Sequence, residues 1–419
     1  MELKRVVVTG VGTINPLGKT VEEFFDNLLK GVSGAGPITR FDASKFKTQF
    51  ACEVKNFDVA QHPEALDKKE ARKLDMYTQF AMIAAHEIIK DSGLDLATEN
   101  VDEIGVVWAS GIGGIRTFFD EVKGFALGDG TPRYSPFFVP KMIADIAAGQ
   151  ISMKYGLRGP NYATVSACAS STHALIDAFD LIRLGKATAI VAGGSEAPIV
   201  EAAMGGFSSA QALSTRNDSP ETASRPFDVD RDGFVMGEGA AGLMLEELEH
   251  AKARGAKIYA EIVGGGMTAD AYHLTAPHPE GLGAASVMRK ALEDAGLKPE
   301  DIDYINVHGT STPVGDIAEI KAVEKVFGEH TYKMNISSTK SMTGHLLGAT
   351  GALEALACIC TIQRGMIPPT INNQNLDPAF DKRLNLTLHT AQKREVKAAL
   401  SNTFGFGGHN ASVIFKKFE

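Results

Sequence analysis

The segment AAHEIIKDSGLDLATENVDEIGVVWASG (residues 84–111) has the pattern of a helix, a polar connection and a buried strand. Gly93 stands where helices commonly end in a left-handed residue. The segment MRKALEDAGLKPEDIDYINVHGTS (residues 288–311) repeats this pattern, with Gly296 at the matching position. The repetition predicts that the chain is built from two related halves.

Two further pairs of segments support the duplication. The run HALIDAFDLIRLGKATAIV (173–191) matches GALEALACICTIQRGMIPP (351–369), and RVVVTGVG (5–12) matches KIYAEIVGGG (257–266). Strands alternate with helices in both halves, which is typical of mixed or parallel sheets covered by helices. The helix beginning near residue 351 is apolar on all sides, so we expect a layer of helices between two sheets.

Length and composition agree with this organisation and exclude several classes of protein. The 419 residues exceed what one hydrophobic core usually supports, so we predict two halves, residues 1–257 and 258–419. The net charge of −9 argues against a nucleic-acid-binding protein. No apolar run approaches the roughly 20 residues of a membrane helix. Four scattered cysteines and the absence of a signal-peptide pattern favour the cytoplasm.

Cys168 lies in TVSACASSTHALIDAF (164–179), where a strand-like run gives way to a helix of about 15 residues by its apolar pattern. The first turn of a helix offers unpaired N–H groups and a partial positive charge. Both favour the reactive thiolate, so we expect a lowered pKa and a nucleophilic role. The backbone N–H of Cys168 could also bind an oxyanion. The alternative is a small residue that only fills the core.

The second half supplies partners for this cysteine. His308 ends a strand-like run, and His345 lies in a glycine-rich loop before the apolar helix, with Lys340 and Glu354 on either side of it. A cysteine with two histidines suits acyl chemistry on thioesters, whereas either histidine alone would more often be a satisfied or surface residue. Cys358 and Cys360 face different sides of a helix, and we predict no metal site.

Four motifs together resemble the β-ketoacyl-acyl-carrier-protein synthases. They are SACASS (166–171), HGTSTPVGD (308–316), STKSMTGHLLGATGA (338–352) and SNTFGFGGHNAS (401–412). The likeness spans essentially the whole chain and is greatest to the type II elongating enzymes of fatty-acid synthesis. It implies an α/β, thiolase-like fold, with two pseudo-duplicated halves in five layers (α-β-α-β-α), usually as a homodimer.

The resemblance implies a decarboxylative Claisen condensation. Cys168 takes an acyl group from acyl carrier protein, and malonyl-carrier protein then loses CO₂ and lengthens the chain by two carbons. His308 and His345 would stabilise the enolate as neutral donors, supported by Lys340 paired with Glu354. No cofactor is implied, because acyl carrier protein brings the substrates on its own phosphopantetheine.

The resemblance also assigns the oxyanion site and the gate of the acyl pocket. It places the oxyanion on the N–H groups of Cys168 and Phe404, and makes Phe404 the gate. Gly405 and Phe406 would belong to the adjoining mobile, substrate-binding loop.

Further substrate contacts are implied on both sides of the nucleophile. Thr310 and Thr312 match positions that hydrogen-bond the pantetheine arm, and Ile112 and Phe207 match residues that line the acyl pocket.

Docking of an acidic carrier protein onto an acidic chain requires a local basic patch. The segment KKEARKLD supplies Lys69, Arg72 and Lys73, which a helix would place on one face, and Arg133 lies in a later loop. A solvated helix face is the alternative. Relatives often carry an arginine where this chain has Gln211.

Other members of the thiolase superfamily would differ from this chain at identifiable positions. A thiolase would have a second catalytic cysteine near the C-terminus, and an initiating type III synthase would have asparagine in place of His345. A non-catalytic chain-length-factor-like subunit would lack the nucleophile. A polyketide-type ketosynthase remains an alternative, because it would use the same chemistry.

Overall fold

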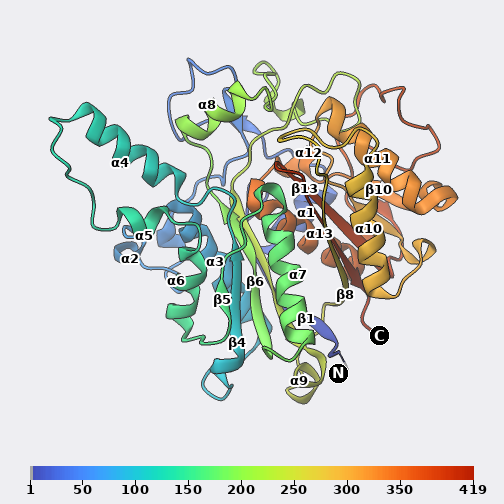
Figure 1. Cartoon of the computed structure of the whole chain (residues 1–419), viewed down its shortest axis with the longest axis horizontal. Coiled ribbons are helices and arrows are strands. Elements are labelled where there is room, and N and C mark those ends of the chain that lie inside the picture. Colours follow the sequence, from blue (N-terminus) through green and yellow to red (C-terminus); the bar gives the residue numbers. More distant parts are fainter. Residues whose placement is uncertain (1–2) are drawn as a thin grey trace.

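A computed structural model describes residues 3–419. Within this range, ten strands form one continuous mixed sheet in the order β10-β9-β13-β14-β8-β1-β7-β6-β4-β5 (Figure 1). The strands are β1 (Val6–Ile14), β4 (Ile104–Ala109), β5 (Asn161–Tyr162), β6 (Ala189–Glu196), β7 (Gly239–Glu247), β8 (Ala260–Ala269), β9 (Tyr304–Asn306), β10 (Asn335–Ser337), β13 (Ala398–Gly405) and β14 (His409–Lys416). Short strands outside this sheet are β2 (Gly36–Pro37), β3 (Phe50–Ala51), β11 (Met366–Ile367) and β12 (Gln392–Lys393).

The strand pattern confirms the predicted duplication. In the first half, β1–β7 and β7–β6 pair antiparallel while β6–β4 and β4–β5 pair parallel. In the second half, β8–β14 and β14–β13 pair antiparallel while β13–β9 and β9–β10 pair parallel. The two five-stranded sheets do not remain separate, because Val6, Val7 and Val8 of β1 pair antiparallel with Ile262, Glu261 and Ala260 of β8.

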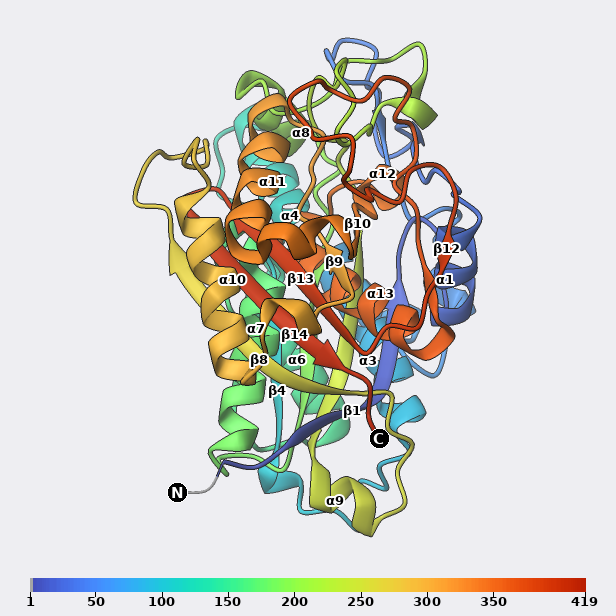
Figure 2. The same ribbon diagram turned by 90° about the vertical axis from the view of Figure 1, so that its right-hand side faces the viewer.

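Helices cover both outer faces and fill the space between the two five-stranded sheets (Figure 2). Helix α3 packs on β1, β6 and β7, α10 packs on β8 and β14, and α7 and α13 pack on each other in the centre. The helices are α1 (Val21–Leu29), α2 (Lys68–Ala71), α3 (Met76–Ser92), α4 (Ile115–Leu127), α5 (Phe138–Met142), α6 (Ile146–Tyr155), α7 (Ser170–Arg183), α8 (Glu201–Ser209), α9 (Leu248–Ala253), α10 (Leu282–Ala295), α11 (Pro313–Phe327), α12 (Lys340–Thr343) and α13 (Thr350–Arg364). This is the predicted layered α/β fold.

The central helix α13 explains why its sequence is apolar on all sides. Every residue from Thr350 to Ile359 is buried. Its core cluster combines side chains of α7 and α13 with strands of both halves. A helix enclosed in this way has no solvent face and therefore shows no polar stripe.

The helices end at the glycines that the sequence predicts, whereas one expected strand is not part of the main sheet. Gly93 and Gly296 both have φ of 64°, a left-handed conformation that glycine adopts without a Cβ clash. The strand-like run after α13 forms only β11, which pairs with β12 outside the main sheet. The structural counterpart of β6 in the second half is β13, more than thirty residues later in the chain.

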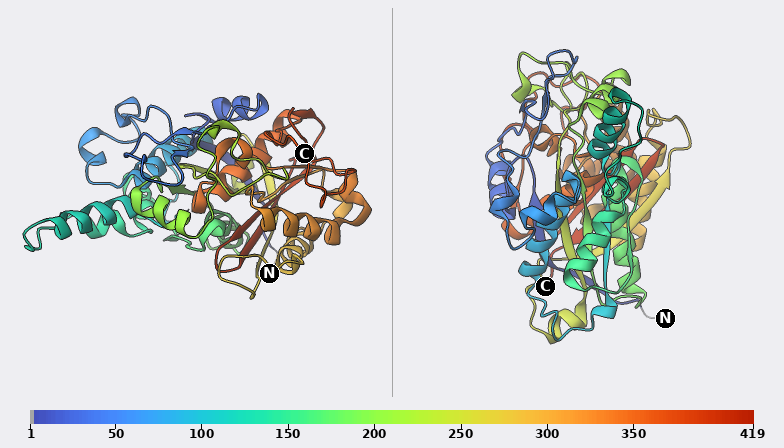
Figure 3. Two further views of the ribbon diagram at one scale, coloured as in Figure 1. Left: turned by 90° about the horizontal axis from the view of Figure 1, so that it is seen from above. Right: turned by 90° about the vertical axis from the view of Figure 1, so that its left-hand side faces the viewer.

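The α4–α5 segment projects from the body of the molecule (Figure 3). Several of its large apolar side chains are exposed, namely Phe118, Val122, Phe125, Tyr134, Phe137 and Val139. Within residues 3–419, no helix combines the length and the apolar character needed to cross a membrane.

Candidate active site

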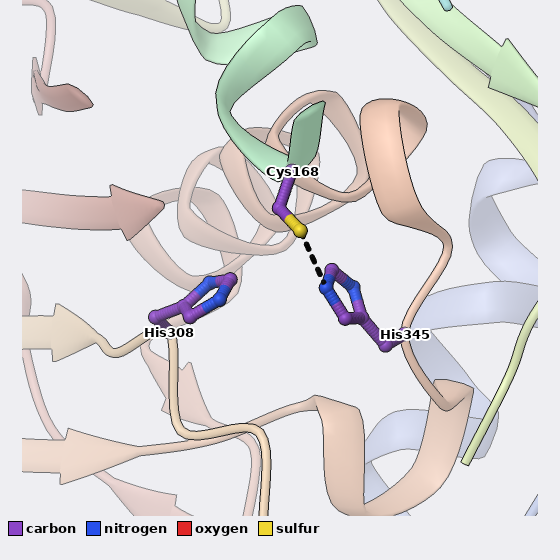
Figure 4. A group of neighbouring side chains, drawn as sticks. All are labelled: Cys168, His308 and His345. Atoms are coloured by element: carbon purple, nitrogen blue, oxygen red, sulfur yellow. Dashed lines mark hydrogen bonds between the residues drawn. The ribbon is translucent and has the colours of Figure 1, made fainter. Parts of the chain in front are cut away.

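The structure brings Cys168, His308 and His345 together from three different elements (Figure 4). Cys168 lies in the turn before α7, His308 follows β9, and His345 lies between α12 and α13. The Nε2 atom of His345 is 3.0 Å from the Sγ atom of Cys168. The ring centroids of the two histidines are 5.3 Å apart. All three side chains are buried, at 8 %, 9 % and 2 % exposure, so substrate groups that reach them leave bulk water.

Cys168 lies in a strained turn. Ala167, directly before Cys168, has φ of 51°, which is uncommon for a residue with a Cβ. Leu347 has φ of 47° at the equivalent place before α13, where Gly348 takes the position of Cys168. A Cβ on Gly348 would lie 2.4 Å from the nitrogen of Gly111. The duplication thus keeps the turn in both halves but leaves room for a side chain in only one of them.

A buried ion pair lies near the histidines. The Nζ atom of Lys340 contacts the carboxylate of Glu354, and both side chains are nearly inaccessible to solvent. Burial, followed by the Lys340 charge, holds the pKa values of His308 and His345 well below the ordinary value. Burial raises the pKa of Glu354 to about 7, and Lys340 acts against that rise. Both imidazoles are therefore neutral at physiological pH and can each donate one N–H.

The expected depression of the cysteine pKa is wrong for this structure. Burial raises the pKa of the Cys168 thiol to about 11, while the Lys340 charge and the N–H groups of Phe406 and Cys168 act in the opposite direction. The helix terminus can be recognised in the sequence, but the burial of the sulfur cannot. Burial disfavours the thiolate more than the turn favours it.

The assignment of the oxyanion donor to Phe404 is also wrong. The N–H groups that reach the Cys168 sulfur belong to Phe406 and to Cys168 itself. Phe404 is still part of β13, opposite Asn410, whereas Phe406 is the first residue of the turn that follows. The ring of Phe404 instead packs against His308 at a centroid distance of 5.7 Å. Because Phe-Gly occurs twice in FGFGG, the sequence does not distinguish Phe404 from Phe406 for this role.

A cavity of about 300 Å³ leads to the trio. Phe207, Thr310, Thr312, Gly405 and Phe406 line it, together with Cys168, His308, His345 and Phe404. The hydroxyl oxygens of the two threonines are 3.1 Å apart.

Ile112 does not line this cavity. It packs with Phe207, Met204 and Leu347 in an adjoining apolar cluster. The cavity therefore brings together most of the predicted substrate contacts, while Ile112 lies behind one of its walls.

The residues predicted to dock a carrier protein lie elsewhere and do not form one long helix face. Helix α2 is a single turn that ends before Arg72, so the expected i, i+3, i+4 face does not exist. Lys73 pairs with Glu70, and Arg133 pairs with Asp129. Lys69, Arg72 and Arg133 are exposed, and none of them lines the cavity. Gln211 does line it.

Two residues near the histidines were missed from the sequence. The carboxylate of Glu319 accepts hydrogen bonds from the N–H groups of His308 and Gly309, each at 2.8 Å. The Oγ1 atom of Thr350 is 2.9 Å from Nδ1 of His345. Thr350 could have been found as a hydroxyl at the start of α13. Glu319 carries no comparable signal, because it approaches His308 only through the packing of α11.

Comparison with known proteins agrees with this geometry. The family model "Beta-ketoacyl synthase, N-terminal domain" matches residues 3–251, and "Beta-ketoacyl synthase, C-terminal domain" matches residues 259–374. The chain belongs to the β-ketoacyl synthase family. It is therefore an acyltransferase-type enzyme with a ketosynthase fold.

Curated relatives match along the whole chain. "3-Oxoacyl-[acyl-carrier-protein] synthase 2" of Staphylococcus aureus (strain COL) is 51 % identical over 417 residues, which cover 99 % of each chain. The protein of the same name from Synechocystis sp. is 50 % identical over 419 residues, covering 100 % of this chain and 99 % of the relative.

Solved structures share the fold at lower identity. A β-ketoacyl synthase from Burkholderia phymatum has a TM-score of 0.90 and 37 % identity, covering 99 % of this chain and 100 % of the other. A type II polyketide ketosynthase, solved with its acyl-carrier protein and bound to a hexaketide, has a TM-score of 0.91 and 32 % identity over 100 % of both chains.

Proposed function

We propose that this β-ketoacyl synthase condenses malonyl-carrier protein with an acyl group held on Cys168, and so elongates fatty acids by two carbons. The observation that carries the proposal is the contact of 3.0 Å between Cys168 Sγ and His345 Nε2, with His308 beside them at the end of a cavity. Two neutral imidazoles next to a nucleophilic sulfur suit both halves of this reaction.

In the first stage the sulfur of Cys168 attacks an acyl thioester. The sulfur–acyl bond forms, the bond to the pantetheine sulfur breaks, and the thiol proton passes to the departing thiol. The N–H groups of Cys168 and Phe406 stabilise the oxyanion. Because the thiol pKa is raised, its proton needs an acceptor, and Nε2 of His345 is the nearest basic atom.

In the second stage malonyl-carrier protein loses CO₂, and the electron pair of the broken C–C bond forms an enolate. Before this stage the neutral His345 ring exchanges tautomer, so that Nε2 carries its proton and Nδ1 accepts from Oγ1 of Thr350. His308 and His345 then donate N–H groups to the enolate oxygen. Its carbon then bonds to the acyl carbonyl, and Cys168 leaves as thiolate. Lys340 and Glu354 position the histidines, and a buried site protects the carbanion from water.

Substrate contacts follow from the lining of the cavity. Thr310 and Thr312 hydrogen-bond the pantetheine arm. Phe207, with Ile112 behind it, accommodates the acyl chain, and Phe406 rather than Phe404 is the gate between chain and entrance.

The partners and setting belong to the same proposal. The substrates arrive on acyl carrier protein, which docks on Lys69, Arg72, Lys73 and Arg133, and no further cofactor takes part. The solved relative with its acyl-carrier protein supports the carrier. We assign the Cys168 trio to catalysis and not to a metal ion, which would occupy the attacking sulfur.

We further propose a homodimer, because the exposed apolar side chains of the α4–α5 segment and the open edge of β5 need a partner surface. A boundary at residues 257/258 and a cytoplasmic location complete the proposal. The free thiols of all four cysteines fit a reducing compartment.

Intact mass spectrometry tests the proposal directly. Incubation with acyl-carrier proteins of graded chain length should add one acyl group to Cys168, and subsequent malonyl-carrier protein should release a product two carbons longer. A chain that binds carrier but never becomes acylated would match the non-catalytic, chain-length-factor-like alternative. Repeated extension to a poly-β-keto product would match the polyketide alternative.

A further inference from the structure

The turn that presents Cys168 needs support from outside itself. Ala167 holds a left-handed conformation, and such residues persist only where their surroundings maintain them. The orientation of this turn sets the direction of both the Cys168 sulfur and the Cys168 N–H. Figure 4 shows the cysteine at the N-terminal end of helix α7.

Helix α7 holds the turn through two side chains. The nitrogen of Ser166 donates to Oγ of Ser170 at 2.8 Å, and that hydroxyl donates to the carbonyl of Ala167 at 2.6 Å. Further along the helix, Nδ1 of His173 shares a hydrogen bond of 2.6 Å with Oγ of Ser166. His173 is thus tied to a residue two positions before the nucleophile.

The same imidazole lies near the hairpin that supplies the other oxyanion donor. Helix α7 packs against β14, which places Asn410 near the His173 ring. Burial lowers the pKa of His173, and the backbone of Asn410 acts against that change. Asn410 lies opposite Phe404 in the β13–β14 pair and four residues after Phe406. His173 therefore holds one of the two segments that carry the N–H groups aimed at the Cys168 sulfur, and lies on a helix that packs against the hairpin of the other.

These two segments are in direct contact, so their spacing has little tolerance. A Cβ added to Gly405 would lie 2.8 Å from the carbonyl oxygen of Ser166 and 3.1 Å from the nitrogen of Cys168. His173 itself does not line the cavity and does not touch the substrate space. It can influence the reaction only through the backbone it holds.

We infer that His173 is a positioning residue for the acylation step, which keeps the Cys168 and Phe406 N–H groups at the spacing an oxyanion requires. The inference rests on the proposed function. Loss of a single oxyanion donor costs about 10²- to 10³-fold in rate in other enzymes, so a modest displacement of both should be measurable. The enolate donors His308 and His345 stand on other elements, and decarboxylation should depend on His173 much less.

The test compares His173→Leu with His173→Asn, because an asparagine amide can place a polar atom near the position of Nδ1. Acylation of Cys168 by acyl-carrier protein is followed by quenched intact mass. His173→Leu should slow acylation by about 10- to 100-fold, while His173→Asn should stay within about threefold of wild type. Ser166→Ala should resemble His173→Leu, and the double variant should be no slower than the slower single one.

A second measurement separates positioning from general packing. In the Cys168→Gln background, CO₂ release from malonyl-carrier protein should change by less than about twofold when His173→Leu is added. Acylation at the wild-type rate in His173→Leu would overturn the inference about His173 and leave the proposed function unaffected. Equal losses in both half-reactions, without rescue by asparagine, would also overturn it, since they mark a packing residue. Failure of wild type to acylate would overturn the proposed function and the inference with it.

Discussion

At the scale of single residues, the proposed mechanism divides the chemistry between two groups. The sulfur and the proposed oxyanion donors come from the turn before α7 and the turn after β13, whereas the neutral imidazoles come from loops of the second half. Burial keeps the imidazoles neutral and the thiol protonated, so neither group is charged before substrate arrives. This division can be tested by removing one group at a time.

Cys168→Gln should abolish condensation and keep decarboxylation. The amide cannot form an acyl-enzyme. It is neutral, however, and can direct its carbonyl oxygen at the backbone N–H groups of residue 168 and Phe406. His308, His345 and Lys340 are untouched, so malonyl-carrier protein should still lose CO₂ and give acetyl-carrier protein. CO₂ release and product mass with malonyl-carrier protein alone provide the measurement. A folded but inert variant would show that the sulfur also serves decarboxylation.

His345→Ala should stop decarboxylation, with a loss of at least about 10²-fold, because the enolate loses one of two N–H donors. Acylation should fall as well but remain detectable, since His345 also contacts the sulfur while the backbone donors are retained. Parallel assays of CO₂ release and Cys168 acylation separate the two effects. CO₂ release near the wild-type rate would remove His345 from the enolate site.

At the scale of elements, the contact between α7 and α13 fixes how near the cysteine lies to His345. Gly351, in the first turn of α13, lies against Thr172 of α7. A Cβ there would come 2.0 Å from the Thr172 hydroxyl and 2.9 Å from its nitrogen. The same hydroxyl is 2.8 Å from that of Thr403 on β13. The two helices therefore approach closely at the ends that carry the chemistry.

Gly351→Ala should lower the free energy of unfolding by about 1–3 kcal/mol, the usual range for overpacking, and should slow condensation. Gly149→Ala, in α6, is the matched control, because its added methyl group would meet only Cδ1 of Ile146, at 4.0 Å. Alanine is the better helix former, so this control should not lose stability. Urea unfolding and the condensation rate are measured on both variants. Equal stability and equal rates in the two variants would refute the close approach of α7 and α13.

A second prediction at the scale of elements concerns carrier-protein docking on the basic residues around α2. Arg72→Glu should raise KM for acyl-carrier protein severalfold at low salt with little change in kcat, because exposed charges at an interface mainly alter encounter. KM for a small acyl thioester without carrier should not change. Lys186→Glu, just beyond the far end of α7 from Cys168, is the control and should leave both KM values unchanged. Equal KM values for wild type and Arg72→Glu would exclude this surface from docking.

At the scale of the whole molecule, buried glutamates make stability depend on pH. Burial raises the pKa of Glu87 to about 7, against the N–H groups of Thr13 and Val21, which lower it. Glu87 lies on α3, outside the active site. Because its folded pKa is raised above the unfolded one of 4.5, the unfolded chain loses this proton first. The stabilisation is therefore complete below pH 4.5 and is lost as pH rises through 7.

Glu87→Gln should remove this dependence, because an amide does not ionise in the window. Relative to the variant, wild type should be more stable at pH 4.5 than at pH 7.5, by on the order of 1–3 kcal/mol. Urea unfolding of both proteins across that range provides the measurement. Parallel stability curves would show that Glu87 does not titrate between these values in the folded protein.

The sequence predicts the fold and the candidate site residues because both leave local patterns. The duplication follows from repeated helix–glycine–strand segments, and Gly93 and Gly296 adopt the left-handed conformation expected of them. Cys168 and the two histidines stand out as reactive side chains in loops rich in small residues. These patterns depend on neighbours within a few positions, so they can be recognised without tertiary structure.

The errors arise where several segments meet. Phe404 and Phe406 differ by two positions in FGFGG, and only the end of β13 decides which N–H turns toward the sulfur. The face expected of Lys69, Arg72 and Lys73 assumed a helix that in fact ends after one turn. Glu319 reaches the backbone of His308 through the packing of α11.

The sequence by itself therefore determined the two halves, the helix ends and the cysteine and two histidines that the structure brings together. The tertiary structure alone decided the short β1–β8 pairing that joins the sheets, the neutral state of the imidazoles and the raised pKa of the thiol. It also brought Cys168 to within 3.0 Å of a histidine 177 residues away in the chain. The physical reason is that helix ends and turns depend on nearby residues, whereas burial and charge depend on everything packed around a group.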